Sequence, residues 1–135
     1  MLDSALHWSH EATFEATPLS ASHVRAFVSQ HLVEHRLLYL VDPVRLVASE
    51  LATNALVHAQ TAFTVTLGTL AETVLLTVRD WSGALPARRC AQAMDSAGRG
   101  LEIVDIVSLA WGITEDPAGS KAVWASFAIR AAREF

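Results

Sequence analysis

The sequence predicts an α+β fold in which helices cover one face of a mixed or mostly antiparallel sheet, forming two layers. Expected strands follow one another as hairpins, and the expected helices do not alternate strictly with them. The 135 residues fit a single domain over 1–135. With 52% hydrophobic and 18% charged residues, the chain has enough apolar side chains to bury a core.

The N-terminal part is expected to form one strand and two helices. The segment 5–16 is interpreted as an edge strand. Ser20 is the expected N-cap of a helix over 21–36, where apolar residues recur at helical spacing. Asp42 is the expected cap of a second helix over 43–59, which has a proline at its first position.

The C-terminal part is expected to form two hairpins separated by a loop and a helix. Apolar and polar residues alternate over 63–67 and 74–78, and the short link between them predicts an antiparallel hairpin. Periodicity is lost over 81–97, which predicts a loop long enough to be functional. A helix at about 101–108 follows, and then a last hairpin formed by 109–114 and 123–130.

Three polar residues lie one helical turn apart in the second helix, at Glu50, Asn54 and His58. On a helical wheel they fall at roughly 0°, 40° and 80°. Apolar residues flank this stripe on both sides, namely Leu46, Val47, Leu51 and Val57. A carboxylate and an amide in apolar surroundings need partners. Either Glu50 and Asn54 hydrogen-bond to loop backbone, or they line a pocket for a ligand or ion. His58 is closer to the helix end and fits a C-terminal cap better than a catalytic group.

Two further polar features lie where loops meet regular elements. Asp80 ends a predicted strand, at the entrance to the long loop. Gly98 and Gly100, with Arg99 between them, precede a helix, and a glycine-rich helix N-terminus favours phosphate. Each feature is common in proteins without a ligand, so neither identifies a site alone.

Taken together, these motifs resemble the ATP-binding domain of the GHKL superfamily, with a histidine kinase-like ATPase fold. The finer resemblance is to the anti-sigma regulatory factors that act as serine/threonine protein kinases. It is carried by four runs over 46–127, namely LVASELATNALVHA, VRDWSGALP, GRGLEIVDIVSLAWGI and GSKAVWASF.

The resemblance implies a role for each matching residue. Glu50 matches the general base, and Asn54 matches the ligand of the magnesium ion that bridges the phosphates. Asp80 matches the residue that accepts a hydrogen bond from the amino group of adenine. The remaining matches are expected to contact the nucleotide and are Gly83, Gly98, Arg99, Gly100 and Leu101, with the ATP lid at about 83–97.

The chain departs from the family pattern at two motifs. Ser82 and Ala84 stand where the family has the two glycines after the aspartate, and Ala122 replaces a threonine after a lysine. These departures keep open the alternative of a non-catalytic ATP-binding interaction module. A detached histidine-kinase catalytic domain is a further alternative, which the absence of a dimerisation-histidine domain in this short chain disfavours.

The resemblance also implies partners: a sigma factor and an anti-anti-sigma antagonist protein, bound by a homodimer. Formal net charge is −4 with scattered basic residues, which argues against direct nucleic-acid binding. No apolar run suits a membrane span, and one cysteine fits a cytoplasmic location. His31 and His35 are four residues apart, but no third metal ligand is evident in the sequence, which favours a surface pair; the same interpretation applies to His7 and His10.

Overall fold

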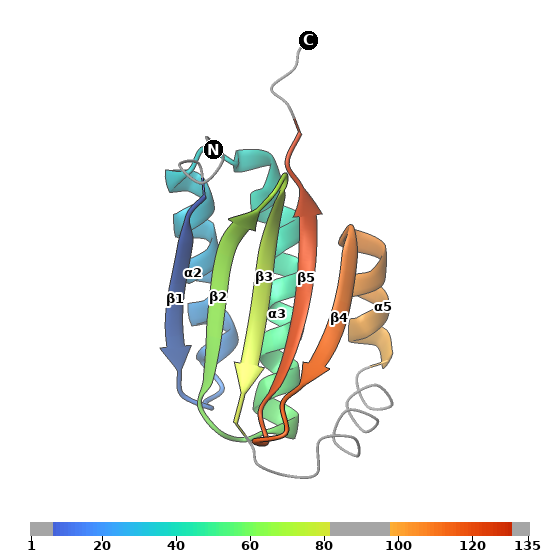
Figure 1. Cartoon of the computed structure of the whole chain (residues 1–135). Helices are drawn as coiled ribbons and strands as arrows, with labels where there is room; N and C mark the ends of the chain where they lie inside the picture. Colours follow the sequence, from blue (N-terminus) through green and yellow to red (C-terminus); the bar gives the residue numbers. More distant parts are fainter. Residues whose placement is uncertain (1–6, 82–97, 131–135) are drawn as a thin grey trace.

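The computed structural model describes residues 7–81 and 98–130 and shows an α+β fold, with a five-stranded antiparallel sheet covered on one face by helices (Figure 1). The strands are β1 (Ser9–Phe14), β2 (Phe63–Leu70), β3 (Thr73–Asp80), β4 (Ala110–Glu115) and β5 (Lys121–Ala128). The helices are α2 (Ser20–Glu34), α3 (Val41–His58) and α5 (Gly98–Val107), with a short 3-10 turn η1 at Leu38–Leu40. None of the helices within the described ranges has the length and apolar character needed to cross a membrane.

The sheet has the strand order β1-β2-β3-β5-β4, and every neighbouring pair is antiparallel. Both predicted hairpins are present, β2–β3 and β4–β5. The first turns at Ala71, which has a φ of 56°, and the second at Gly119, which has a φ of 106°. The edge strand predicted within 5–16 is β1, paired with β2. The predicted order of elements is therefore confirmed, and the sheet is wholly antiparallel.

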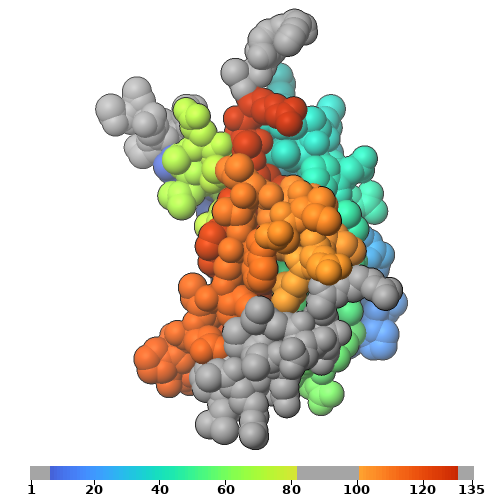
Figure 2. Space-filling model, turned by 90° about the vertical axis from the view of Figure 1, so that its right-hand side faces the viewer, coloured from blue at the N-terminus to red at the C-terminus, as the bar shows by residue number. Residues whose placement is uncertain are grey.

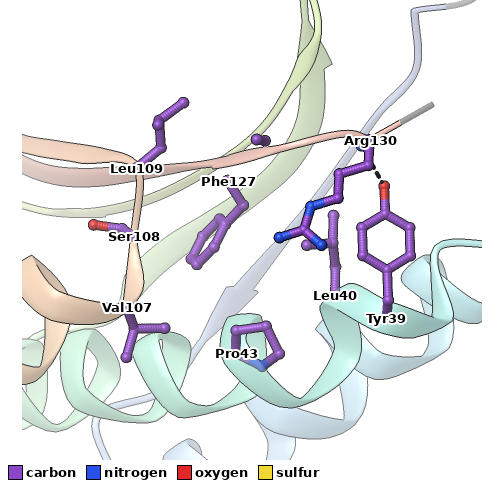
Figure 3. Close-up of a pocket in the computed structure, with 9 residues that line it drawn as sticks. Tyr39, Leu40, Pro43, Val107, Ser108, Leu109, Phe127 and Arg130 are labelled. Atoms are coloured by element: carbon purple, nitrogen blue, oxygen red, sulfur yellow. Dashed lines mark hydrogen bonds between the residues drawn. The ribbon is translucent and has the colours of Figure 1, made fainter.

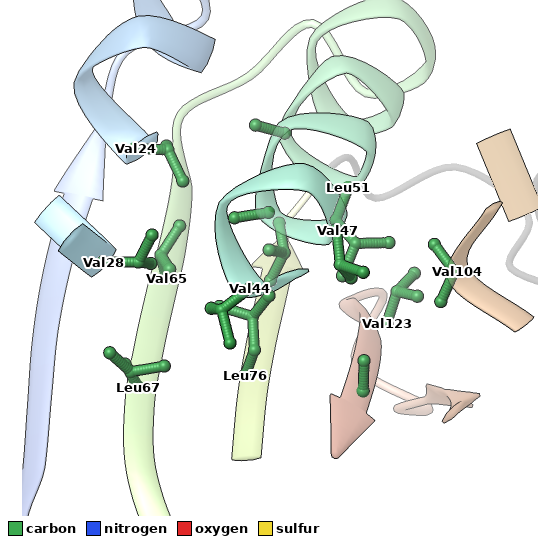
Figure 4. Close-up of a cluster of buried hydrophobic side chains, with 14 of the residues drawn as sticks. Val24, Val28, Val44, Val47, Leu51, Val65, Leu67, Leu76, Val104 and Val123 are labelled. Carbon is green, nitrogen blue, oxygen red and sulfur yellow. The ribbon is translucent and has the colours of Figure 1, made fainter. Parts of the chain in front are cut away.

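The hydrophobic core lies between the sheet and the helices (Figure 4). Its largest fully buried side chains alternate along the central strands and recur at helical spacing on α2, α3 and α5. They are Phe63, Val65 and Leu67 of β2, Val74 and Leu76 of β3, Val24, Val28 and Leu32 of α2, Val44, Val47 and Leu51 of α3, and Val104 of α5. The apolar face predicted for the last strand is also confirmed, because Val123, Ala125 and Phe127 are buried.

Both predicted helix caps are wrong. The N-cap of α2 is Leu19, and Ser20 is the first helical residue; its hydroxyl accepts a hydrogen bond from the Thr17 amide and donates to the Glu15 carbonyl. The helix α3 begins at Val41, immediately after η1, with Leu40 as its N-cap. Asp42 is exposed within the first turn and makes no capping hydrogen bond there. A carboxylate at that position still interacts favourably with the helix dipole.

Candidate functional site

Several elements predicted to carry functional residues converge at one end of the sheet. The strand β3 finishes at Asp80, which is paired with Phe63 at the start of β2 and with Lys121 at the start of β5. Because α3 ends at His58, shortly before Phe63, its C-terminal turn lies at this same end. The N-terminus of α5 points the same way, since its C-terminus leads into β4 at the far end (Figure 1). We call this region the Asp80 end.

Asp80 lies on the helix-covered face of the sheet. Strand alternation places it on the same side as the buried residues Leu76 and Val78, and only 4% of Asp80 is exposed. Both Asp80 and His58 have interaction partners in the structure. A carboxylate buried this deeply is held in a fixed position, which suits recognition of a specific hydrogen-bond donor.

Glu50 and Asn54 lie on α3 one turn apart, about 6 Å along the helix axis. Asn54 is 8% exposed, and Glu50 is half-buried. Within residues 7–81 and 98–130, neither side chain has a hydrogen-bond or ion-pair partner. Among the described residues, only Ser29 Oγ is a buried side-chain polar atom without a partner, so the polar atoms of Glu50 and Asn54 are accessible to water or to a ligand. These accessible polar groups are compatible with a pocket that faces a ligand, and the loop of 82–97, the other candidate partner, lies outside the described residues.

The apolar flanks of this stripe differ from each other. Val47 and Leu51 are buried against the sheet, as expected. Leu46 and Val57 are 43% and 54% exposed, so the expectation of apolar burial on both sides is wrong for this flank. A helical wheel gives the angular order of side chains but not which neighbouring element covers them. Glu50 and Asn54 therefore lie at the boundary between the core and an accessible surface, where a ligand can reach them.

The helix α5 begins earlier than the sequence predicted. Gly98, Arg99 and Gly100 form its first turn, whereas they were expected to precede the helix. The free backbone N–H groups of this turn therefore lie at the Asp80 end. Leu101 is 7% exposed and lies on the inner side of α5, as does Val104. Figure 2 views the β4 edge and shows α5 lying between β4 and α3. Gly83, together with the loop predicted at 83–97, lies outside the described residues.

Lys121 is a candidate site residue that the sequence analysis missed. It stands directly opposite Asp80 in the sheet register and is only 5% exposed. Directly opposed residues share a face, so its side chain lies on the helix-covered side of the sheet. The adjacent Ser120 is fully buried and accepts a hydrogen bond from Arg79 Nη1 at 2.9 Å, which fixes the turn before Lys121. The signal that could have identified this lysine is the Gly-Ser-Lys run at the start of the last strand.

A pocket of about 310 Å³ lies at the opposite end of the molecule (Figure 3). It is lined by Tyr39, Leu40, Pro43, Val107, Ser108, Leu109, Phe127, Ala128 and Arg130. The Tyr39 hydroxyl accepts a hydrogen bond from the Arg130 amide at 2.8 Å across its mouth. None of the predicted site residues lines this pocket, and few polar side chains converge in it. We therefore place the candidate site at the Asp80 end on chemical grounds.

The groups at the Asp80 end suit a phosphate ligand with a hard cation. Carboxylate and amide oxygens are preferred ligands of Mg²⁺, and a helix N-terminus favours phosphate oxygens. In comparisons with known proteins, no family model matches the chain and no curated protein matches it significantly.

Proposed function

We propose that this chain is an ATP-binding anti-sigma regulatory factor with serine/threonine kinase activity. The observation that carries the proposal is the pair Glu50 and Asn54, which lacks partners among the described residues. The pair lies on α3, whose C-terminal turn is at the same end of the sheet as Asp80 and the first turn of α5. The ordered motifs that resemble the GHKL superfamily give this arrangement its chemical interpretation.

Each residue has a separate task under this proposal. The Asn54 amide oxygen would hold the magnesium ion, which supplies charge neutralisation at the phosphates. The Glu50 carboxylate would accept the proton of the attacking hydroxyl. Asp80 would accept a hydrogen bond from the amino group of adenine. The backbone N–H groups of Gly98–Gly100 would bind phosphate oxygens. Lys121 would add a positive charge near this anionic ligand.

The proposed substrate is a serine or threonine on an antagonist protein, and the proposed second partner is a sigma factor. We propose that the chain acts as a homodimer in the cytoplasm. These partners follow from the resemblance alone, whereas the Asp80 end supports the nucleotide site. The two parts of the proposal are therefore tested separately.

The nucleotide site is tested by isothermal titration of the folded protein with ATP, with and without Mg²⁺. We expect magnesium-dependent binding that is weakened in Asn54→Ala and unchanged in Glu72→Gln. Glu72 is exposed at the β2–β3 turn, far from the Asp80 end, and serves as the matched control. Absence of ATP binding by the folded protein would remove the basis for the proposal.

A non-catalytic ATP-binding module is the second candidate, favoured by Ser82, Ala84 and Ala122 where the family has glycine, glycine and threonine. Transfer of phosphate from ATP to a candidate antagonist distinguishes the two. Transfer that is lost in Glu50→Gln and kept in Glu72→Gln supports a kinase. ATP binding without transfer supports the module. A product that is labile in acid would instead indicate phosphohistidine and a histidine-kinase activity.

A further inference from the structure

Three histidines and a glutamate gather where β1 packs against the C-terminal end of α2. They are His10 of β1, His31 and Glu34 of α2, and His35 just after that helix. We call them the histidine cluster. The sequence favoured a surface pair of His31 and His35, because no third ligand was evident. The sheet supplies a third histidine, because it brings His10 against them, and all three imidazoles are half-buried.

The alternation of β1 explains how His10 reaches this place. Trp8, His10, Ala12 and Phe14 are half-buried and share one face, while Ser9, Glu11 and Thr13 between them are exposed. Their shared face is turned toward α2, where Phe27, His31 and His35 recur at four-residue intervals. A strand and a helix distant in sequence therefore present histidines to each other.

The distances within the cluster are short. His10 Nε2 lies 2.9 Å from His35 Nε2, and His31 Nδ1 lies 2.9 Å from Glu34 Oε1. One ligand atom from each of His10, His31 and Glu34 can be chosen so that all lie within 4.8 Å of one another. Metal–nitrogen bonds to zinc are about 2.0–2.1 Å long, so ligand atoms around one ion are separated by roughly 3–4 Å. Side-chain rotations that separate the stacked rings of His10 and His31 would let this set share an ion.

The rings also stack, and stacking is the simplest alternative explanation. The centroids of His10 and His31 are 3.7 Å apart, and those of Trp8 and His35 are 3.8 Å apart. Stacking, however, does not require imidazole, because phenylalanine would pack the same way. It requires neither ring nitrogens that face each other nor a carboxylate beside them. Imidazole nitrogens combined with one carboxylate are a characteristic ligand set for zinc.

We propose that His10, His31 and Glu34, with His35 as a fourth ligand, bind a divalent transition-metal ion of the zinc class. Such an ion would join the edge strand β1 to the end of α2, in addition to the packing and the His10–His35 hydrogen bond between them. The cluster lies at the far end of β1 from the Asp80 end, because His10 pairs with Leu67 while Phe14 pairs with Phe63. The zinc site is therefore independent of the proposed nucleotide site.

The test is isothermal titration of the full chain, without a histidine tag and freed of metal by EDTA, with zinc chloride at neutral pH. We expect one zinc ion per chain and a melting temperature that rises with zinc concentration. His10→Gln and Glu34→Gln should each weaken binding at least about tenfold. His23→Gln should bind as the parent protein does, because His23 is exposed on the first turns of α2, away from the cluster.

Further measurements keep the proposal falsifiable if His10→Gln folds poorly. Glu34 is exposed on the helix surface, so Glu34→Gln is expected to fold normally, and circular dichroism checks this. Cobalt as the probe should give visible absorption bands typical of four-coordinate nitrogen and oxygen ligation. Magnesium should neither bind the cluster nor compete with zinc there. Zinc binding that persists at full affinity in both variants, or no zinc binding by the folded parent protein, would overturn the proposal.

Discussion

The Asp80 end and the histidine cluster are two polar regions at opposite ends of the same fold, and their side chains are satisfied differently. In the histidine cluster, the polar groups contact one another, as in the 2.9 Å pair of His31 and Glu34. On α3, Glu50 and Asn54 have no partner within the described part of the chain. The first arrangement stabilises the fold by itself and can recruit an ion. The second leaves a carboxylate and an amide available to a ligand, as in a binding site with a few convergent polar groups.

Among the variants that test this comparison, a replacement of Glu50 has the largest expected effect, which is on phosphate transfer. In Glu50→Gln, phosphate transfer to an antagonist protein should fall about 10²–10⁴-fold, because an amide cannot accept the proton. The free energy of unfolding should change by less than about 0.5 kcal/mol, since the side chain is half-buried and makes no described polar contact. The rate of phosphate transfer measures the first effect, and thermal unfolding measures the change in stability. An unchanged transfer rate would show that Glu50 is not the base.

Replacing Asn54 should separate binding from stability. Leucine has the same branching pattern as asparagine but is larger, and it removes an amide that has no described partner in a residue that is 8% exposed. We expect Asn54→Leu to raise the free energy of unfolding by about 1 kcal/mol. The same change should weaken Mg²⁺-ATP binding at least tenfold, as judged by titration. A loss of stability instead would indicate that Asn54 has a structural partner, and would weaken the case for a ligand site.

Displacing β1 should disturb the histidine cluster alone. A Cβ atom at Gly68 would lie 2.8 Å from the Trp8 carbonyl oxygen, so Gly68→Ala must push the strand that carries His10. We expect a loss of about 1–3 kcal/mol in the free energy of unfolding. Zinc affinity should fall, while ATP affinity is unchanged.

Gly112→Ala is the matched control for this strand displacement. Its Cβ would lie 2.8 Å from the Trp124 ring, at the other edge of the sheet. It should also lower stability but leave zinc binding intact. Equal zinc affinities in the two variants would contradict the assigned position of the site.

Acidification should have the smallest effect and act through the histidine cluster. The pKa of His10 lies below its usual 6.5, mainly because of burial and then because of the charges of His31 and His35. These effects outweigh the charge of Glu34, which raises the pKa of His10. The unfolded chain therefore binds more protons just below that pH, and stability of the metal-free protein falls as the pH drops below 6.5. Urea unfolding at several pH values in this range measures how the free energy of unfolding depends on pH. This dependence should be weaker in His10→Gln. An equal slope in that variant would assign the titration to another group.

Glu34 adds a second, more acidic contribution. Hydrogen bonds from Gln30 and His31 lower the pKa of Glu34 below its usual 4.5. Its stabilisation is fully present above 4.5 and is lost as the pH falls through the lower folded value. Glu34→Gln should remove this step, and the slope that depends on His10 should become steeper, because the Glu34 charge no longer raises the pKa of His10.

The order of the elements, both hairpins and the polar stripe of α3 were predictable from sequence, because hydrophobic periodicity and turn chemistry act over a few residues. The packed structure decided the rest. It placed Lys121 beside Asp80, joined His10 to α2, and left Leu46 and Val57 exposed. It also placed the starts of α2 and α3 earlier than expected, because α3 follows η1 directly and the Ser20 hydroxyl bonds to the Thr17 amide and the Glu15 carbonyl. These outcomes depend on contacts between segments that are distant in the sequence. Local sequence patterns predict individual helices and strands but do not predict such contacts.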